Sequence, residues 1–322
     1  MKFRPSATAL LAAALAPFAV ATADPGDDFA TAGGIDDITE AALGPTGRGG
    51  VRPDNMPKPA ETDKTSLDRF AFTVGADWTN AYIWRGFVQE DSGFIIQPYA
   101  TISYETFKNE DVTLNFNFST WQSFHDNETA SPKPSGIYAQ WYEADYTVGA
   151  SVVWGKWNAG VTYGWLTSPS AAFTRIEELT GVVSFDDSEY LGAWSLKPAV
   201  LIAYETGPGF NDGRDRGVYL QLGILPGFDV RLSEQTTLRF DFPVSAGFSL
   251  HNYYQNASGG DAFFGFVQAG TKLSVPLPLP ESFGAWTFNA AASICYMGDH
   301  PAVTNGGTNT QWVFSSGVSL AF

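Results

Sequence analysis

The side chains best suited to chemistry in this sequence are charged and amide groups at alternate positions of apolar segments. Glu143 and Asp145 form the clearest pair, because they alternate with Tyr142, Ala144 and Tyr146. A period of two places such residues on one face of a β-strand. There they could bind solutes along a polar surface. Polar residues that share such a face in their segments are Asp77, Arg85, Gln97, Asn115, Asn117, Glu143, Asp145, Glu178, Arg239 and Asp241.

Two interpretations of these polar residues stay open on the sequence alone. In the first, they line the inside of a barrel as a ladder that filters or binds solutes. In the second, they fill a narrow barrel as internal ion pairs, for example Arg85 or Arg239 with Asp77 or Glu143. Both interpretations point them inward, since a charged group on a lipid-facing wall costs about 2–4 kcal/mol at the membrane midplane.

Catalytic and metal chemistry find little support in the sequence. The three histidines, His125, His251 and His300, all fall in predicted loops. They lack both the His–Ser pair of outer-membrane lipid hydrolases and the spacing of metal ligands. The single Cys295 permits no internal disulfide. We therefore predict no enzyme activity, no cofactor and no metal site, with a lipid-modifying enzyme as the least favoured alternative.

The elements that must position these residues are β-strands. In Val112–Trp121 the apolar and polar side chains alternate without exception up to Ser119, and Gln311–Phe322 repeats the pattern. We expect twelve such strands: Phe72–Trp84, Ile95–Glu105, Val112–Trp121, Trp141–Trp154, Trp157–Leu166, Ile176–Phe185, Trp194–Glu205, Gly217–Ile224, Thr236–Leu250, Ala262–Val275, Ala285–Met297 and Gln311–Phe322.

Strands of this kind close into a transmembrane antiparallel β-barrel, because every backbone group must be paired in lipid. An even strand number fits a single-chain bacterial barrel. The final strand, which stops at the aromatic Phe322, resembles the closing strand of outer-membrane barrels. An edge strand of a soluble sandwich is the alternative for that segment alone. Tryptophans and tyrosines at strand ends, Tyr82, Trp84, Trp154 and Trp157 among them, predict aromatic girdles.

Composition and the N-terminus agree with export to a membrane. The chain has 322 residues, of which 44% are hydrophobic, 15% aromatic and 16% charged. Residues 1–23 read as a signal peptide that ends at an A-x-A site. Residues 24–69 read as a flexible periplasmic extension, with a plug inside the barrel as the sharper alternative. Residues 70–322 form the barrel. A net charge of −16 disfavours nucleic acid as a partner.

A short motif carries a family resemblance. The segment Asn80–Gln89, which reads NAYIWRGFVQ, resembles the opening signature of Gcw_chp, an uncharacterised bacterial family regarded as outer-membrane barrels. It keeps Tyr82, Arg85, Gly86 and Gln89, and departs from the signature at Asn80 and at Val88. The resemblance covers about Phe72–Phe185. It implies the location and the fold, and it brings no biochemical activity with it.

The sequence therefore predicts a roughly twelve-stranded barrel of the bacterial outer membrane, working as a narrow porin-like channel for small solutes. A non-conducting barrel with a structural or surface-interaction role is the alternative. The expected partners are outer-membrane lipid, the outer-membrane assembly machinery and small solutes. Glu143 and Asp145 would favour cations or neutral solutes, because carboxylates in a low-dielectric wall create a negative potential.

Overall fold

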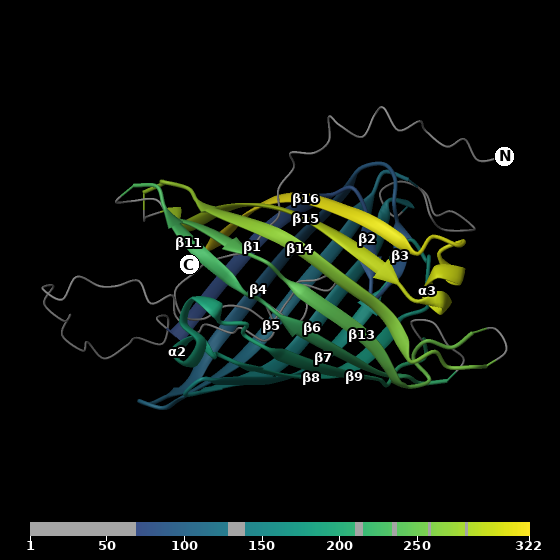
Figure 1. The fold of residues 1–322 in the computed structure, drawn as a ribbon, viewed down its shortest axis with the longest axis horizontal. Helices are drawn as coiled ribbons and strands as arrows, with labels where there is room; N and C mark the ends of the chain where they lie inside the picture. Colours follow the sequence, from purple (N-terminus) through teal and green to yellow (C-terminus); the bar gives the residue numbers. More distant parts are fainter. Residues whose placement is uncertain (1–68, 128–138, 210–214, 234–236, 257–258, 281–282) are drawn as a thin grey trace, which may run out of the picture.

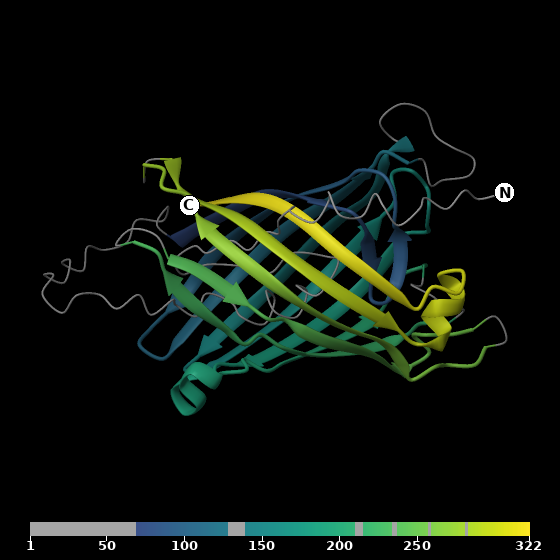
Figure 2. The ribbon, with the colours of Figure 1, turned by 45° about the horizontal axis from the view of Figure 1, so that its top comes forward.

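The computed structural model describes residues 69–127, 139–209, 215–233, 237–256, 259–280 and 283–322. They form a closed antiparallel β-barrel (Figures 1 and 2). The expected barrel of about twelve strands is thus confirmed. The predicted signal peptide and almost all of the predicted extension lie outside the described residues. No helix in the described ranges has the length and apolar character to cross a membrane.

The barrel wall follows the chain order, each strand pairing with the next. The first eight wall strands are β1 (Phe70–Thr79), β4 (Ile95–Lys108), β5 (Val112–His125), β6 (Trp141–Trp154), β7 (Trp157–Thr167), β8 (Ile176–Phe185), β9 (Ala199–Glu205) and β10 (Val218–Ile224). The remaining wall segments are β11 (Gly227–Arg231), β12 (Thr237–Asp241), β13 (Val244–His251), β14 (Phe264–Pro276), β15 (Ala285–Met297) and β16 (Thr310–Ala321).

Two wall strands are interrupted by proline. Pro226 separates β10 from β11, and Pro243 separates β12 from β13. Proline cannot donate to the ladder of hydrogen bonds, so each strand breaks there and resumes. Both β12 and β13 pair with β14, while β14 pairs with β15 on its other side. Counting each interrupted strand once gives twelve positions in the ring.

The ring closes where the first strand meets the last. Thr73–Thr79 pair with Ser315–Ala321, and the backbones of Phe72 and Phe322 exchange two hydrogen bonds of 2.9 and 3.2 Å. Both ends of the wall therefore lie at the same end of the barrel, which we call the terminal end. The other end, the hairpin end, carries the connections 80–94, 126–140, 168–175, 206–217, 252–263 and 298–309. At the terminal end, 109–111 and 155–156 are tight turns.

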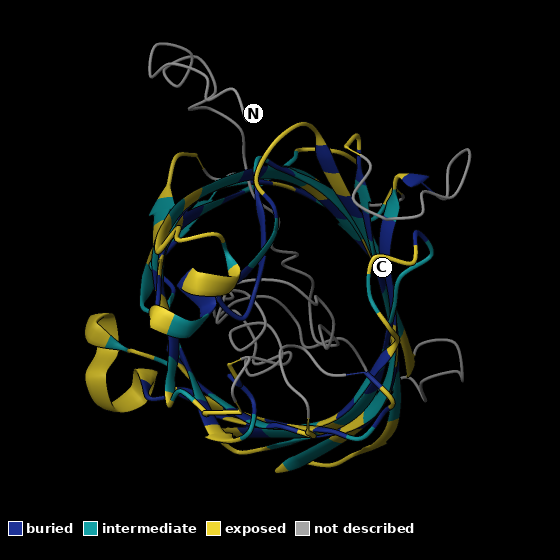
Figure 3. Ribbon diagram, turned by 90° about the vertical axis from the view of Figure 1, so that its right-hand side faces the viewer, coloured by how far each residue is buried: buried dark blue, intermediate teal, exposed yellow. Residues whose placement is uncertain are grey.

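The wall strands carry both buried and exposed residues (Figure 3), and the two faces of the wall differ in chemistry. Outward-facing side chains such as Phe116, Val161 and Ile202 are exposed and apolar. Inward-facing side chains are mostly small and polar: Thr101, Ser103, Asn115, Asn117, Ser119, Ser151, Gln268, Asn289, Ser293 and Ser319 are all buried. Apolar-out and polar-in is the arrangement of a transmembrane barrel.

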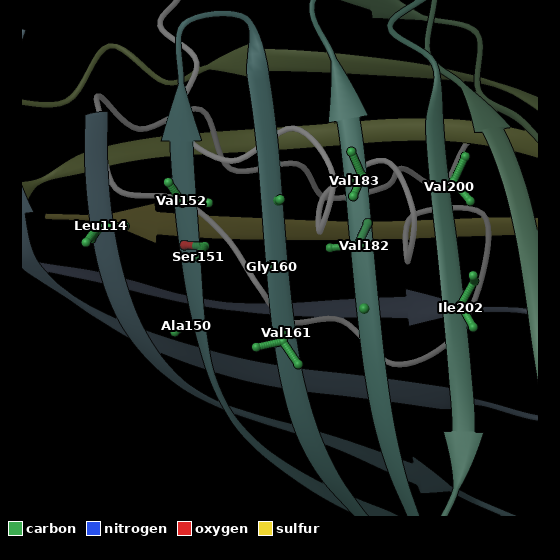
Figure 4. A pocket seen from close by; sticks show the side chains of 12 residues that line it. Leu114, Ala150, Ser151, Val152, Gly160, Val161, Val182, Val183, Val200 and Ile202 are labelled. Carbon is green, nitrogen blue, oxygen red and sulfur yellow. The ribbon is translucent and has the colours of Figure 1, made fainter. Parts of the chain in front are cut away.

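A shallow groove of about 580 Å³ runs over the outer surface of β5 to β9 (Figure 4). Its floor contains Ala150, Ala159 and Gly181, and a Cβ added to Gly181 would meet nothing within 4 Å. Branched side chains, among them Val161 and Ile202, form its sides. The groove is therefore part of the apolar outer face.

Some strand ends depart from the sequence-based boundaries. The expected strand Phe72–Trp84 ends at Thr79, and the chain then turns inward. The expected strand Trp194–Glu205 begins only at Ala199, because a short helix α2 (Ser188–Leu191) and the 3-10 turn η3 (Gly192–Trp194) precede it. At the hairpin end a second helix, α3 (Asp299–Thr304), precedes β16.

Candidate functional site: a hairpin inside the barrel

The connection between β1 and β4 folds into the barrel instead of extending into solvent. It forms a two-stranded hairpin of β2 (Tyr82–Trp84) and β3 (Phe87–Glu90), with Arg85 and Gly86 at its tip. Figure 1 shows both strands at the hairpin end, and Figure 3 shows the buried hairpin inside the ring of strands. Every residue of β2 is buried, and so is Arg85.

The tip of the hairpin requires an unusual backbone. Arg85 has φ of 46° and Gly86 has φ of 90°, both in the left-handed region. Glycine adopts this region without steric cost, whereas other residues do so rarely. A Cβ on Gly86 would also lie 3.3 Å from Cβ of Phe266 on β14. The Arg-Gly pair therefore lets the tip turn against the opposite wall.

The two faces of the hairpin pack against different parts of the wall. Tyr82 and Trp84 belong to a cluster with Ile95, Trp121, Tyr142, Leu166 and Ile176, which lie on β4 to β8. Ile83 and Phe87 belong to a second cluster, whose other members are Val182, Ala199, Leu201, Ala203, Tyr219, Tyr253, Tyr254, Phe266, Cys295 and Met297. Successive residues of a strand point to opposite sides. The hairpin thus bridges the interior from one cluster to the other.

Arg85 is held by a fully buried set of partners. Its guanidinium donates two hydrogen bonds to the carboxylate of Glu178, of 2.7 and 2.9 Å, and a third to Tyr253 Oη at 2.9 Å. The rings of Tyr219 and Trp84 lie 4.3 and 4.5 Å from its Cζ. Bidentate carboxylate and aromatic faces are the partners that allow a guanidinium to be buried.

Further hydrogen bonds fix the backbone around the tip. Tyr254 Oη donates to the carbonyl of Arg85 at 2.9 Å. The side chain of Asn305 donates to the carbonyl of Gly86 and accepts from the amide of Val88, each at 2.9 Å. Backbone groups at this turn are therefore satisfied by side chains from the loop after β13 and from the end of α3.

Hydrogen bonds also hold the base of the hairpin. Asn80 pairs with β16, because its amide donates to Phe314 O at 3.0 Å and its Oδ1 accepts from Phe314 N at 2.5 Å. Tyr82 Oη donates to Glu143 at 2.9 Å, and Tyr142 donates to Gln89. The hairpin is thus tied to the wall at its base, its middle and its tip.

The polar residues singled out from the sequence fall into separate groups. One group lies at the hairpin: it consists of Arg85 at the tip and its wall neighbours Glu178 and Glu143. Asp145 is buried on β6, two residues after Glu143. Gln97 donates to Ser123 at 3.3 Å, while Asn117 accepts from Ser103 at 2.8 Å, and Asn115 is buried on the same face of β5. Asp77 stands opposite Gln97 on the neighbouring strand. Arg239 and Asp241 lie on β12 towards the terminal end.

The ion pairs differ from the examples expected from the sequence. Arg85 pairs with Glu178 rather than with Asp77 or Glu143. Arg239 pairs with Asp241 at 2.7 Å on its own strand and lies 3.7 Å from Asp229 on β11. The cause is topological, because the hairpin carries Arg85 across the interior to β8, away from the strand that precedes it.

Several residues of the site were missed from the sequence. Tyr82 and Trp84 were expected in an aromatic girdle, but they are buried inside the barrel. Tyr253, Tyr254 and Asn305 lie in segments that read as polar loops. One signal was available: the run from Ala81 to Val88 is almost entirely apolar or aromatic, which is unlike a loop exposed to water.

The histidine positions also need correction. His125 is the last residue of β5, buried rather than in a loop, and its Nε2 lies 2.9 Å from Ser123 Oγ. Its ring stacks on Tyr142, with centroids 4.5 Å apart. Nδ1 of His125 has no hydrogen-bond partner among the described residues, so no acidic group orients this Ser–His pair there. Across all the residues that the structure describes, no three His, Cys, Asp or Glu side chains are grouped to hold a metal ion.

Comparison with known proteins yields similarity of fold. No family model matches the chain, and no curated protein matches it. Solved structures with a similar course include the COG4313 outer membrane channel from Pseudomonas putida F1, 9% identical, covering 83% of this chain and 100% of that one with a TM-score of 0.46. The NanC porin is 10% identical, and the match covers 77% of this chain and 98% of that one with a TM-score of 0.37. The translocator domain of the autotransporter NalP from Neisseria meningitidis is 11% identical, and the match covers 81% of this chain and 90% of that one with a TM-score of 0.38. At these identities and scores the similarity is one of fold alone.

Proposed function

We propose that the chain is a barrel of the bacterial outer membrane that passes small solutes, and that the β2–β3 hairpin restricts the passage. The observation that carries the proposal is the combination of a polar inner wall with a hairpin that bridges it. Side chains such as Asn115, Asn117 and Ser119 line the interior with hydrogen-bonding groups, whereas a purely structural barrel could be filled by apolar residues.

The direction of the barrel follows from its connections. The hairpin end carries mostly long connections, whereas the terminal end carries the tight turns 109–111 and 155–156 as well as the longer connection 186–198. In outer-membrane barrels the longer loops face outward and the short turns face the periplasm. We therefore place the hairpin near the outer surface. Outer-membrane lipid would surround the apolar wall, and the outer-membrane assembly machinery would insert it.

The charges near the hairpin favour cations or neutral solutes over anions. The one basic group at its tip, Arg85, is neutralised by Glu178. Glu143, Asp145 and Glu205 are further buried acidic residues of the neighbouring wall strands. A water-filled passage past these carboxylates would carry a negative potential, focused by the low-dielectric wall.

The family resemblance supports the same proposal. The positions that match the Gcw_chp signature, Tyr82, Arg85, Gly86 and Gln89, all lie in the hairpin. Each has a structural task there: Tyr82 and Gln89 bind the wall, and Arg85 and Gly86 form the tip. We propose membership of that family, with the signature marking the inward hairpin.

Single-channel recording in a planar bilayer tests the proposal. A variant with residues 80–94 replaced by an Asn-Gly turn should conduct more than the wild type, because the hairpin no longer narrows the interior. A matched control shortens the connection 186–198 in the same way; its helix α2 lies outside the ring of strands, so conductance should stay unchanged. If the hairpin variant folds into membranes but neither it nor the wild type conducts, the alternative of a structural barrel is favoured instead.

Selectivity is tested on the variant that conducts best. The double substitution Glu143→Gln and Asp145→Asn should move the reversal potential in a salt gradient towards the anion side. Glu189→Gln, an exposed carboxylate on α2 outside the ring of strands, is the control and should have no effect. An unchanged reversal potential in the double variant would show that solutes do not pass these carboxylates.

A further inference from the structure

A second feature lies at the terminal end, in residues 186–198 between β8 and β9, which we call the foot. It contains α2 and η3, and Figure 3 shows α2 outside the ring of strands. Its large side chains are unusually exposed: Trp194 is 84% exposed and Tyr190 is 68% exposed, and Leu191 and Leu196 are also exposed. Clustered exposed apolar side chains mark an interaction surface.

The exposure does not result from a frayed loop, because hydrogen bonds hold the foot in place. The carboxylate of Asp187 accepts from Ser195 Oγ at 2.5 Å and from the amides of Leu196 and Lys197 at 3.1 and 2.9 Å. Asp186 accepts from the amide of Ser188 at 3.0 Å. The backbone that carries Tyr190 and Trp194 is therefore held in place at both ends of the loop.

The exposed side chains continue the outer face of the barrel. The ring of Trp157 on β7 lies 4.6 Å from that of Phe185 on β8, and Phe185 stacks on Tyr190 with centroids 6.0 Å apart. Trp154, across the tight turn from Trp157, is 63% exposed. An unbroken row of aromatic rings thus leads from the lipid-facing wall onto the foot.

Charged groups of both signs accompany these rings. Lys156 pairs with Glu189, and its Nζ lies 4.3 Å from the ring centroid of Tyr190. Asp186 and Asp187 add two negative charges and Lys197 adds one positive charge. Amphipathic rings among mixed charges suit the headgroup zone of a bilayer, where rings and snorkelling lysines reside. A water-facing protein interface would not need to be continuous with the lipid-facing wall.

We propose that the foot inserts Tyr190, Leu191 and Trp194 into the headgroup zone of the phospholipid leaflet at the terminal end, and so fixes the height of the barrel in the membrane. With three carboxylates and two lysines, counting Lys156, the foot has no excess of positive charge that would require anionic lipid. This inference rests on the barrel spanning a membrane, and the experiment separates the two.

The test measures the depth of spin labels in liposomes of phosphatidylcholine that contain no other protein. Single cysteines replace Trp194, Leu191, Ser188, Val161 and Val303 in a Cys295→Ser background. Each nitroxide is probed by its collisions with oxygen, which concentrates in lipid, and with a nickel chelate, which stays in water. Val161 reports the middle of the outer wall, and Val303 on α3, exposed at the opposite end, reports water. Ser188 is the matched polar position in α2.

The depth measured for the labels at Trp194 and Leu191 should lie between the depths measured at Val161 and Val303. The label at Ser188 should lie closer to water than those two labels. If the label at Val161 itself behaves like that at Val303, the barrel does not span the bilayer. If Val161 reports lipid while Trp194 and Leu191 report water, the foot is not a lipid anchor. Protection of Trp194 in native membranes but not in liposomes would assign the surface to a protein partner and overturn the proposal.

Discussion

The guanidinium of Arg85 and the carboxylate of Glu178 form two parallel hydrogen bonds of 2.7 and 2.9 Å, 93 residues apart in the chain. Both side chains are almost completely buried. A buried pair of this kind contributes less to net stability than its geometry implies, because both ions must leave water. Removing only one of the two side chains is costly, because the charge of the other stays buried without a partner.

Removal of one partner should therefore destabilise the barrel more than removal of both. Glu178→Leu or Arg85→Met alone should each lower the free energy of unfolding by about 3–5 kcal/mol, whereas the double substitution should cost far less. The measurement is the temperature at which the folded, fast-migrating form is lost on gels. Arg175→Met is the control, because Arg175 pairs with Glu177 at a more exposed site. Additive effects in the double variant would contradict this account.

Gly86→Ala should loosen the hairpin tip. A left-handed backbone costs a residue with a Cβ about 1–2 kcal/mol, and here the new Cβ would also press on Phe266. Gly155→Ala provides the control, because Gly155 has φ of 57° but open space around it. Protease cleavage within the hairpin should increase for Gly86→Ala and stay unchanged for Gly155→Ala. Equal resistance of both variants would show that the tip tolerates the change.

A charge on the outer wall should oppose membrane insertion in a depth-dependent way. Val161→Arg, near the middle of β7, should cost about 2–4 kcal/mol, and Val112→Arg, at the first residue of β5, about 0–1 kcal/mol. Urea titrations of folding into liposomes measure both values. Similar costs at the two positions would mean that the apolar outer face is not buried in lipid.

The foot should lose its order in acid. Burial acts to raise the pKa of Asp187, but hydrogen bonds from Ser195 and from the amides of Lys197 and Leu196 outweigh it, so the pKa lies below the ordinary value for aspartate. The charged form is therefore favoured in the folded protein. Its stabilisation is complete above the pKa of an unfolded aspartate and is lost as the pH falls through the lowered pKa.

NMR spectra of the protein in detergent micelles measure this transition. The amide signals of Leu196 and Lys197 should shift with an apparent pKa below that of an ordinary aspartate. In Asp187→Ala they should take their acid positions at every pH. A transition above the ordinary value would contradict the expected sign.

Removal of Phe322 should impair assembly more than removal of residues 24–64. The backbone of Phe322 exchanges two hydrogen bonds with Phe72 at the seam of the barrel. Heat-modifiable migration of each truncated protein after expression measures the folded fraction. Equal folded fractions would show that the last residue is dispensable for closure.

The barrel could be predicted from the sequence because its walls follow a local rule. Each strand has one lipid face and one polar face, so a segment such as Val112–Trp121 reveals its structure through its own alternation. The inward direction of Asn117 or Glu143 follows from the same rule. The breaks at Pro226 and Pro243 were harder to place, because proline ends one segment of a strand and another begins directly after it.

The inward hairpin could not be predicted in this way. Tyr82 and Ile83 contact opposite clusters, so both faces of β2 are apolar and the alternation disappears. With no polar face, the segment reads as an extension of the strand before it. The partners of Arg85 are also set by the closed shape of the barrel, since Glu178 and Tyr253 lie far away in sequence.

The positions of those partners set the order in which the protein can assemble. Arg85 meets Tyr253 across 168 residues of chain, and Val88 meets Asn305 across 217. Contacts of such long range form late, because the intervening chain must first be ordered. The hairpin is among the first described segments to leave the ribosome, but its partner Asn305 is among the last. The docking of the hairpin and the closing of the seam therefore become coupled steps of insertion. In a chain whose final strands are missing, the apolar hairpin would lack the wall residues that it packs against. It would then stay exposed to the proteases and chaperones that recognise incomplete barrels.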